Sequence, residues 1–205
     1  MFKKPIIVFE GIEGSGKSFH LKAVSKFLKK KNKKFIIIRE PGGHKNSEKI
    51  RRLILNKKSN FNKHTDLLLY MAARSENIDL INKNKDKKII LIDRFIDSTI
   101  AYQHYAMGVN IQLIKMINKH LLKNIKISFT FLNTVNHKNM RLRLLRRKKL
   151  NRYDNFNYTF YKKAQDGFIK ISKTNPKKYM KINSNLNIEL NKKIILNKIN
   201  KLINL

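Results

Sequence analysis

The chain contains no cysteine, which excludes a disulfide framework and any metal site built on thiolates. It has no run of about 18 or more apolar residues, so the sequence predicts no membrane-spanning helix and no membrane partner. Its first residues carry no long apolar segment followed by a small-residue cleavage site, so we expect no signal peptide and a cytoplasmic location. With 205 residues, of which 41% are apolar, we expect a single folded domain over residues 1–205.

Acidic residues are scarce, at 13 against 47 lysines and arginines, which gives a formal net charge of +34. Such a charge favours binding to a polyanion such as nucleic acid. Lysine, however, outnumbers arginine 37 to 10 and is spread from end to end of the chain. This even spread indicates a compositional bias that leaves lysine on solvated faces, so we expect no nucleic-acid partner.

Arginine is informative in such a chain, because its rigid fork grips phosphate and planar acceptors in a way that lysine does not. Five of the ten arginines fall within residues 141–152, and Arg39, Arg74 and Arg94 stand alone. Glycine is also scarce, and five of the seven glycines lie in two short segments, 11–16 and 42–43. Because glycine serves where the backbone must adopt φ > 0 or approach another group closely, these segments predict two specialised loops.

Apolar runs and helical patterns alternate along the chain. The runs at 4–9, 34–39, 88–93, 125–132 and 178–183 predict buried strands. Helical spacing of apolar residues marks 17–30, 156–171 and 195–202. Strands that alternate with helices predict an α/β fold, with about five parallel strands in a three-layer arrangement and helices on both faces of the sheet.

The first predicted strand runs into the motif G-x-x-x-x-G-K-[ST], which opens the first predicted helix. In this context the backbone N–H groups cradle phosphate oxygens, and the helix N-terminus favours the negative charge. The lysine would reach the β- and γ-phosphates of ATP and the final hydroxyl would ligate Mg²⁺. This P-loop NTPase motif comprises Gly11, Ile12, Glu13, Gly14, Ser15, Gly16, Lys17 and Ser18.

The strand "IILID" ends in Asp93, followed by Arg94. A carboxylate at the end of a strand beside the phosphate loop suits a Mg²⁺ site, directly or through water. The arginine suits a pocket where two phosphate-bearing substrates meet, since one guanidinium can bridge both. An Asp–Arg pair on the surface is the alternative interpretation.

Four segments, "FEGIEGSGKS", "REPGG", "LLLYMAARSE" and "DRFIDSTIAYQ", resemble the thymidylate kinase family in sequence and order, and "RRKKLNRYD" resembles its lid. The resemblance covers roughly residues 5 to 175 and implies transfer of the γ-phosphoryl group of ATP to dTMP, giving dTDP for dTTP synthesis. It also implies Mg²⁺ as the cofactor and a homodimer. Asn133 departs from the family, which commonly has aspartate at this point.

The resemblance also implies residue roles. Arg39 would grip the acceptor phosphate, and Pro41 would lie beside the thymine methyl group. Tyr70 would stack on the base, although the apolar sequence around it also suits simple core packing. Arg74 would donate to a base carbonyl. The remaining residues implied at the dTMP pocket are Glu13 near the 3′-hydroxyl, Arg94 at the phosphate, and Ser98, Thr99, Tyr102 and Gln103 along the wall.

Residues 141–155 are expected to form a mobile basic lid, with an amphipathic helix that starts near Val135 and runs into a loop. Gly14 occupies the position where one subtype of the family has an arginine in the phosphate loop. The chain is similar to the other subtype, in which the lid supplies the positive charge. The implied catalytic residues are therefore Lys17, Arg94 and the lid arginines Arg146, Arg147 and Arg152, of which Arg152 best matches the family pattern Asp-Arg-x-Glu.

Two other functions are open on the sequence alone. A deoxynucleoside kinase would have a related phosphate loop and would phosphorylate thymidine itself, although Arg39 in "REPGG" argues against an acceptor without phosphate. A basic, ATP-dependent nucleic-acid-binding protein would account for the net charge of +34. An acceptor panel and the salt dependence of DNA binding distinguish these two from a thymidylate kinase.

Overall fold

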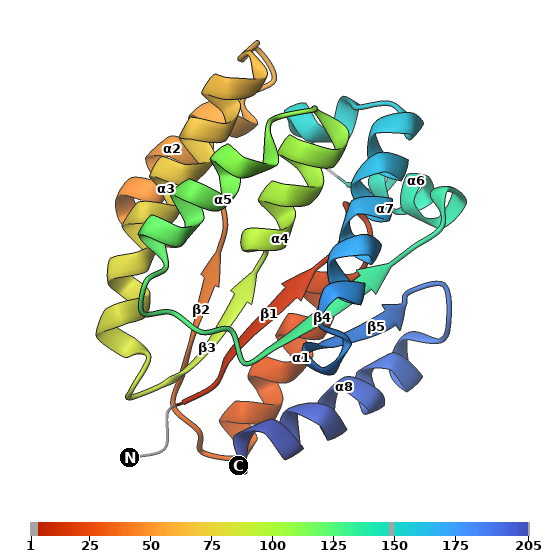
Figure 1. The fold of residues 1–205 in the computed structure, drawn as a ribbon. Coiled ribbons are helices and arrows are strands. Elements are labelled where there is room, and N and C mark those ends of the chain that lie inside the picture. Colours follow the sequence, from red (N-terminus) through yellow and green to blue (C-terminus); the bar gives the residue numbers. More distant parts are fainter. Residues whose placement is uncertain (1–3, 148–149, 205) are drawn as a thin grey trace.

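The computed structural model describes residues 4–147 and 150–204, arranged around one parallel sheet (Figure 1). The strand order is β2-β3-β1-β4-β5, and every pairing is parallel. The predicted fold class is thereby confirmed. The strands are β1 (Ile6–Glu10), β2 (Phe35–Arg39), β3 (Ile89–Asp93), β4 (Phe129–Thr134) and β5 (Tyr179–Asn183).

The fourth predicted strand, 125–132, begins too early. Residue Ile125 instead closes a turn, because its N–H donates to the Leu122 carbonyl. The parallel register with β1 starts only where Phe129 faces Ile7. Before this point Ile125 and Ile127 pack against the cluster that contains Ile6 and Val8, and the strand continues to Thr134.

Alternate side chains of β1 point to opposite faces of the sheet. Ile7 and Phe9 belong to a cluster with residues of α1 (Lys17–Lys30) and α8 (Ile188–Ile203). Ile6 and Val8 belong to a second cluster with residues of α3 (Lys63–Asn84). The sheet thus has a helical layer on each face, as Figure 1 shows, and both faces of its central strand are buried.

The other helices are α2 (Lys45–Leu55), α4 (Ile96–Thr99), α5 (Ile111–Leu121), α6 (His137–Leu145) and α7 (Tyr158–Thr174). The expected helix near Val135 is α6, which begins two residues later. Asparagine is abundant in this chain, and five helices begin at an asparagine whose side-chain oxygen accepts a backbone N–H: Asn62, Asn110, Asn136, Asn157 and Asn187. Part of the compositional bias therefore serves as helix caps.

Helix α4 continues without a break into η1 (Ile100–Ala106), a π-helical turn in which the Met107 N–H donates to the Tyr102 carbonyl. Wide turns of this kind recur at functional sites. Tyr105 of this turn packs against Gly167 of α7, where an added Cβ would lie 2.5 Å from the tyrosine ring. Among the described residues, no helix is long and apolar enough to cross a membrane.

Candidate functional site

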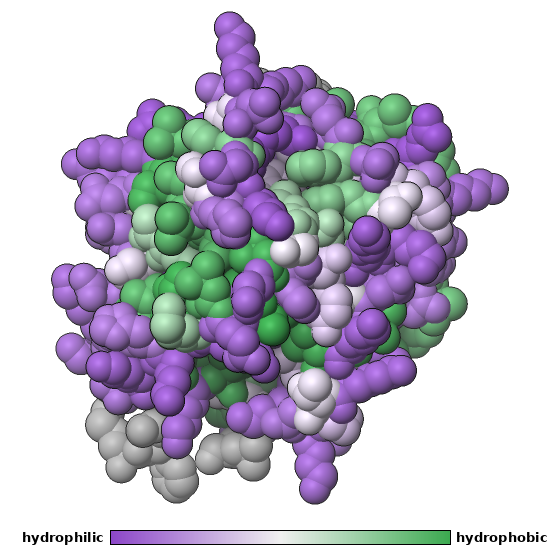
Figure 2. Space-filling model, turned by 45° about the horizontal axis from the view of Figure 1, so that its top comes forward, coloured by the Kyte–Doolittle hydropathy of each residue, from purple (hydrophilic) through white to green (hydrophobic). Residues whose placement is uncertain are grey.

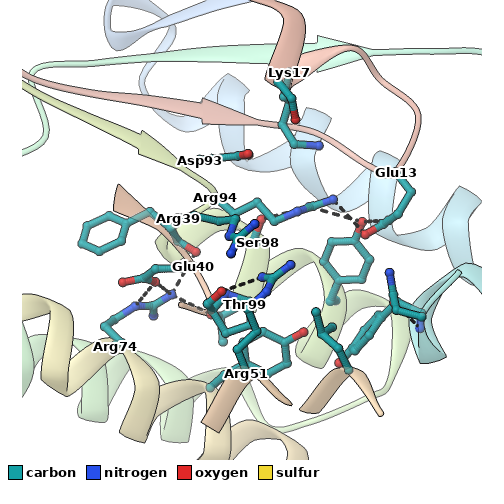
Figure 3. Close-up of a pocket in the computed structure, with 18 of the residues that line it drawn as sticks. Glu13, Lys17, Arg39, Glu40, Arg51, Arg74, Asp93, Arg94, Ser98 and Thr99 are labelled. Carbon is teal, nitrogen blue, oxygen red and sulfur yellow. Dashed lines mark hydrogen bonds and ion pairs between the residues drawn. The ribbon is translucent and has the colours of Figure 1, made fainter. Parts of the chain in front are cut away.

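A cavity of about 380 Å³ lies at the carboxyl ends of the strands, between the phosphate loop, α2, α3, η1 and the lid. Its lining brings together most of the residues that the sequence nominates. They are Glu13, Lys17, Ser18, Arg39, Pro41, Tyr70, Arg74, Asp93, Arg94, Ser98, Thr99, Tyr102, Gln103 and Arg147. Figure 3 shows the central part of this set. Carboxyl strand ends are where ligands bind in open parallel sheets.

The phosphate loop joins β1 to α1 in a conformation that only glycine permits at its first position. Gly11 has φ +136°, and an added Cβ would lie 2.2 Å from the Asn133 carbonyl oxygen of β4. A buried hydrogen bond of 2.7 Å from the Ser184 hydroxyl to the Ser15 carbonyl fixes the other side of the loop. The loop is therefore held between β4 and the segment after β5.

Lys17 is buried, and its ammonium group donates to the carbonyls of Gly11 at 2.7 Å and Ile12 at 2.9 Å. Burial, together with the charge of the nearby Arg94, lowers the pKa of Lys17 to about 7. An anion in the loop would replace the carbonyl oxygens as its partner and raise this pKa again. The geometry therefore suits a lysine that meets a phosphate.

Asp93 and Ser18 line the cavity together with Lys17. The Oδ1 atom of Asp93 is buried and has no hydrogen-bond partner in the part of the chain that the structure describes. A buried carboxylate oxygen without a partner is costly unless something else satisfies it. A hydrated Mg²⁺ on the Ser18 hydroxyl would do so, and oxygen donors are the ligands that this ion takes, so the residues fit the implied cofactor.

The guanidinium of Arg94 spans the two halves of the cavity (Figure 3). On the phosphate loop it donates to the Gly11 carbonyl and to the Glu13 carboxylate, each at 2.8 Å. Across the cavity it lies 3.4 Å from the hydroxyls of Ser98 and Tyr102. Its backbone has φ 67°, a left-handed conformation that is rare for a residue with a side chain. The Glu13 carboxylate also accepts a short hydrogen bond from Tyr102. Burial opposes ionisation of Glu13, but Arg94 and Lys17 hold its pKa below the usual value.

Arg39, which the sequence nominates for the acceptor phosphate, is half exposed and pairs with Glu48 at 3.0 Å. Arg51 of α2, which sequence reasoning missed, also lines the cavity and donates to the Pro41 carbonyl at 2.6 Å. Burial and the charge of Arg39 lower the pKa of Arg51. Two guanidinium groups, close enough to repel each other, therefore face the acceptor end of the cavity together with Arg94.

Arg74 lines the cavity, but its five N–H groups already have partners. It donates to Glu40 at 2.9 Å, Asn118 at 2.7 Å and Thr99 at 2.9 Å, to the Phe95 carbonyl, and weakly to the Met71 sulfur. Only 2% of the residue is exposed. Figure 3 shows it turned toward Glu40 and Thr99. A base carbonyl could therefore reach Arg74 only by replacing one of these partners.

Tyr70 forms part of an aromatic wall. Its ring meets the ring of Tyr153 edge to face, with centroids 6.1 Å apart, and Tyr153 meets Tyr102 in the same way at 5.9 Å. Tyr153, which belongs to the lid, was not identified from the sequence. A flat ring can stack on the faces of these aromatic side chains or meet their edges, which are the two arrangements that aromatic pairs prefer.

The described parts of the lid, 141–147 and 150–155, place the three nominated arginines differently. Arg147 lines the cavity and pairs with Asp154 at 2.7 Å. Arg152 pairs instead with Asp66 of α3 and is not among the described lining residues. Arg146 is exposed at the end of α6. A fourth arginine, Arg143, ties α6 to the phosphate loop, because it donates to the carbonyls of Gly14 at 2.9 Å and Ser184 at 2.7 Å.

A phosphate loop that faces an arginine-lined pocket across a bridging guanidinium defines a P-loop phosphotransferase with a separate acceptor site. The chain belongs to the thymidylate kinase family, whose model matches residues 9–195. This finding confirms the family that the sequence motifs indicate.

Curated relatives agree along nearly the whole chain. The thymidylate kinase of Mycoplasma mobile is 35% identical over 205 residues, covering 96% of this chain and 98% of the relative. That of Kosmotoga olearia is 32% identical, covering 89% of each chain. A crystal structure of thymidylate kinase from Ehrlichia chaffeensis is similar with a TM-score of 0.77 and 30% identity, covering 96% of this chain and 98% of that one.

Proposed function

We propose that the chain transfers the γ-phosphoryl group of ATP to dTMP and releases dTDP, a step in dTTP synthesis. The observation that carries the proposal is the position of Arg94, which donates to the phosphate loop at Gly11 and Glu13. It also lies 3.4 Å from the hydroxyls of Ser98 and Tyr102, on the acceptor side. Such a guanidinium lies where the transferred group would pass from donor to acceptor. Membership of the thymidylate kinase family supports the choice of substrates.

On the donor side, the backbone of residues 11–18 would hold the phosphates of ATP, and Lys17 would move from the loop carbonyls onto the β- and γ-phosphates. Ser18 and Asp93 would hold Mg²⁺, which neutralises phosphate charge when it is bound. Asp93 fits this role because one of its oxygens is buried without a partner among the described residues.

On the acceptor side, Tyr70 would stack on thymine with Pro41 beside it. Arg39, Arg51 and Arg94 would share the phosphate of dTMP, with Glu13, Ser98, Tyr102 and Gln103 around the sugar and base. Arg74 donates a hydrogen bond of 2.9 Å to the Thr99 hydroxyl. We therefore assign these two residues a structural role in the cavity wall in addition to their contact with the base. Three guanidinium groups at this end support an acceptor that carries phosphate.

The lid would supply a further positive charge. We assign this part to Arg147 first, because it lines the cavity, and to Arg146 second. Arg152, nominated by its place in the family pattern, would act through its pairing with Asp66. Charge in the transition state spreads over the moving phosphoryl group, so positioning and neutralisation account for most of the rate and no strong general base is required.

An acceptor panel tests the proposal. With ATP and Mg²⁺, purified protein is expected to phosphorylate dTMP faster than dUMP, dCMP, dAMP or dGMP and to leave thymidine unchanged. Transfer to thymidine in preference to dTMP would establish the deoxynucleoside kinase alternative. ATP-dependent, salt-sensitive binding of DNA without transfer to any nucleotide would establish the nucleic-acid alternative.

We further propose that the protein works as a cytoplasmic homodimer made of one kinase domain per chain. Leu68 of α3 and Met116 of α5 are large apolar side chains with 57% and 63% exposure, which supports a partner on that side. Hydrophilic residues surround the face shown in Figure 2 on all sides, and apolar residues gather near its middle. The spread of lysine from end to end of the chain supports a solvated basic surface.

A further inference from the structure

The carboxylate of Asp66 joins three parts of the molecule from a position in the first turn of α3, where only 1% of the residue is exposed. One oxygen accepts from the guanidinium of Arg152. The other accepts from the Tyr153 hydroxyl at 2.5 Å and from the Gln103 amide at 3.2 Å. Gln103 also donates to the Tyr153 hydroxyl at 3.2 Å. A single buried acid therefore connects α3, η1 and the lid.

The lid residues in this cluster belong to η2 (Arg152–Asn155). Tyr153 is 3% exposed, lines the acceptor cavity, and presents its ring to Tyr70 and Tyr102. Its hydroxyl and the Gln103 amide meet at Asp66, behind the aromatic wall. The place where the lid attaches to α3 is thus also the back of the acceptor pocket.

Other contacts of η2 shape the segment without tying it to α3. Arg147 and Asn151 both donate to the Asp154 carboxylate, and these hydrogen bonds join residues of the lid to one another. The Tyr161 hydroxyl donates to the Tyr153 carbonyl at 2.5 Å and attaches the segment to α7. Toward α3, the ion pair is the strongest contact: the side chain of Asp66 is 2% exposed and that of Arg152 13%. Removing either member of a buried pair leaves the other charge uncompensated.

Building on the transfer to dTMP proposed above, we propose that Asp66 is a positioning residue that anchors lid residues 151–155 against the acceptor pocket, so that lid placement and acceptor binding are coupled. Asp66 acts through Arg152, Tyr153 and Gln103 and touches neither phosphate group. Because coupling between two equilibria is reciprocal, an acceptor held against Tyr70 and Tyr153 stabilises the anchored lid by the same factor by which the anchor strengthens acceptor binding.

Steady-state kinetics test the anchor. The variant Asp66→Asn keeps the shape of the side chain but removes the charge that pairs with Arg152. We expect its KM for dTMP to rise roughly tenfold, while its KM for ATP stays within about twofold of the wild-type value. A loss of folded protein alone would lower the apparent kcat and leave both KM values unchanged. An unchanged KM for dTMP in a folded Asp66→Asn protein overturns the proposal.

Asp166→Asn is the matched control, because it removes the carboxylate of an exposed pair with Lys162, side-chain exposure 50% and 59%, away from the cluster. Its two KM values are expected to equal those of the wild type. If Asp66→Asn does not fold, Tyr153→Phe carries the same test, since it removes only the hydroxyl. Its KM for dTMP is expected to rise roughly threefold, and no rise overturns the anchor.

Hydrogen exchange separates this proposal from the proposed function. Backbone amides of residues 151–156 are expected to exchange faster in Asp66→Asn than in the wild type or in Asp166→Asn, without any nucleotide. Equal exchange in all three proteins overturns the anchor. Faster exchange in a protein that transfers nothing to dTMP would leave the anchor standing and refute the function. If Asp66→Asn transfers phosphate to dTMP and its KM and exchange rates equal those of the wild type, the function stands and the anchor is refuted.

Discussion

The guanidinium of Arg74 and the carboxylate of Glu40 form an ion pair of 2.9 Å in which the two side chains are only 1% and 5% exposed. Glu40 directly follows β2, and Arg74 lies in the middle of α3. The pair therefore fixes the "REPGG" loop to the helix that carries Tyr70. Because the pair is withdrawn from water, burial raises the pKa of Glu40 even though Arg74 opposes the shift.

Breaking this pair from one side is expected to destabilise the fold. Arg74→Met leaves the Glu40 charge buried without its partner, which costs about 3–5 kcal/mol in the free energy of unfolding. Urea denaturation of Arg74→Met, Glu40→Gln and the double variant measures the cost. We expect the double variant to lose less than the sum of the single losses, because the second change removes the stranded charge. Strict additivity would show that the two side chains are not coupled.

Glycine at position 11 is expected to be essential for nucleotide binding. Gly11→Ala would bring Cβ to 2.2 Å from the Asn133 carbonyl oxygen, so the phosphate loop must move. Gly108→Ala is the matched control, because Gly108 also has positive φ, at +72°, but its added Cβ would meet nothing within 4 Å. Calorimetry with ATP is expected to show binding weakened at least roughly tenfold in Gly11→Ala only. Equal binding by both variants would rule out the steric argument.

Glu10 is expected to make stability depend on pH. Burial and the neighbouring Asp97 raise the pKa of Glu10 from 4.5 to about 7. The folded state therefore holds a proton that the unfolded state releases from about pH 4.5 upward. The stability that this group contributes is complete below pH 4.5 and is lost as the pH rises through 7.

The variant Glu10→Gln isolates this contribution. Between pH 5 and 7.5 the wild type is expected to lose on the order of 1–3 kcal/mol relative to Glu10→Gln, measured by urea denaturation at each pH. The comparison is needed because His20, whose pKa burial lowers to about 4, has the opposite effect: it adds stability as the pH rises from 4 to 6.5. Parallel stability curves for the two proteins would contradict the assignment to Glu10.

Arg51 is expected to matter more for the acceptor than for the donor. Arg51→Gln removes one of the guanidinium groups at the acceptor end of the cavity, while Lys17 and the phosphate loop stay as they are. We expect kcat/KM for dTMP to fall roughly tenfold to a hundredfold, because a charge-assisted hydrogen bond to phosphate is worth about 1.5–3 kcal/mol. Arg52→Gln, at an exposed position of the same helix, is the control. Equal loss in both variants would exclude a specific role for Arg51.

Much of the fold was predictable because strongly apolar runs and helical spacing survive the lysine and asparagine bias. The boundary of β4 was not, since residues 125–128 alternate apolar and polar side chains as a strand does but lie before the register with β1 begins. Arg51 was missed because it stands beside Arg52 in a helix with a charged face. Its spacing of four residues from Leu55, another residue of the cavity, is the signal that would have identified it.

Asp66 was missed for a similar reason, although it precedes Tyr70 by four residues and Arg74 by eight and so shares their helix face. The pairing of Arg152 with Asp66 could not be predicted from the sequence, because the two residues are 86 positions apart in the chain. Patterns of charge show that an arginine is needed, but only the packed chain decides which carboxylate or phosphate it meets.

A crystal structure with ADP and dTMP bound together tests most directly whether two anionic nucleotides meet at Arg94. We predict the phosphate of dTMP within hydrogen-bond distance of the guanidinium of Arg94, thymine against Tyr70, and the β-phosphate of ADP on Lys17. A structure in which dTMP lies outside this cavity, with Arg94 still bound to Gly11 and Glu13 and to no phosphate, would contradict the proposed function.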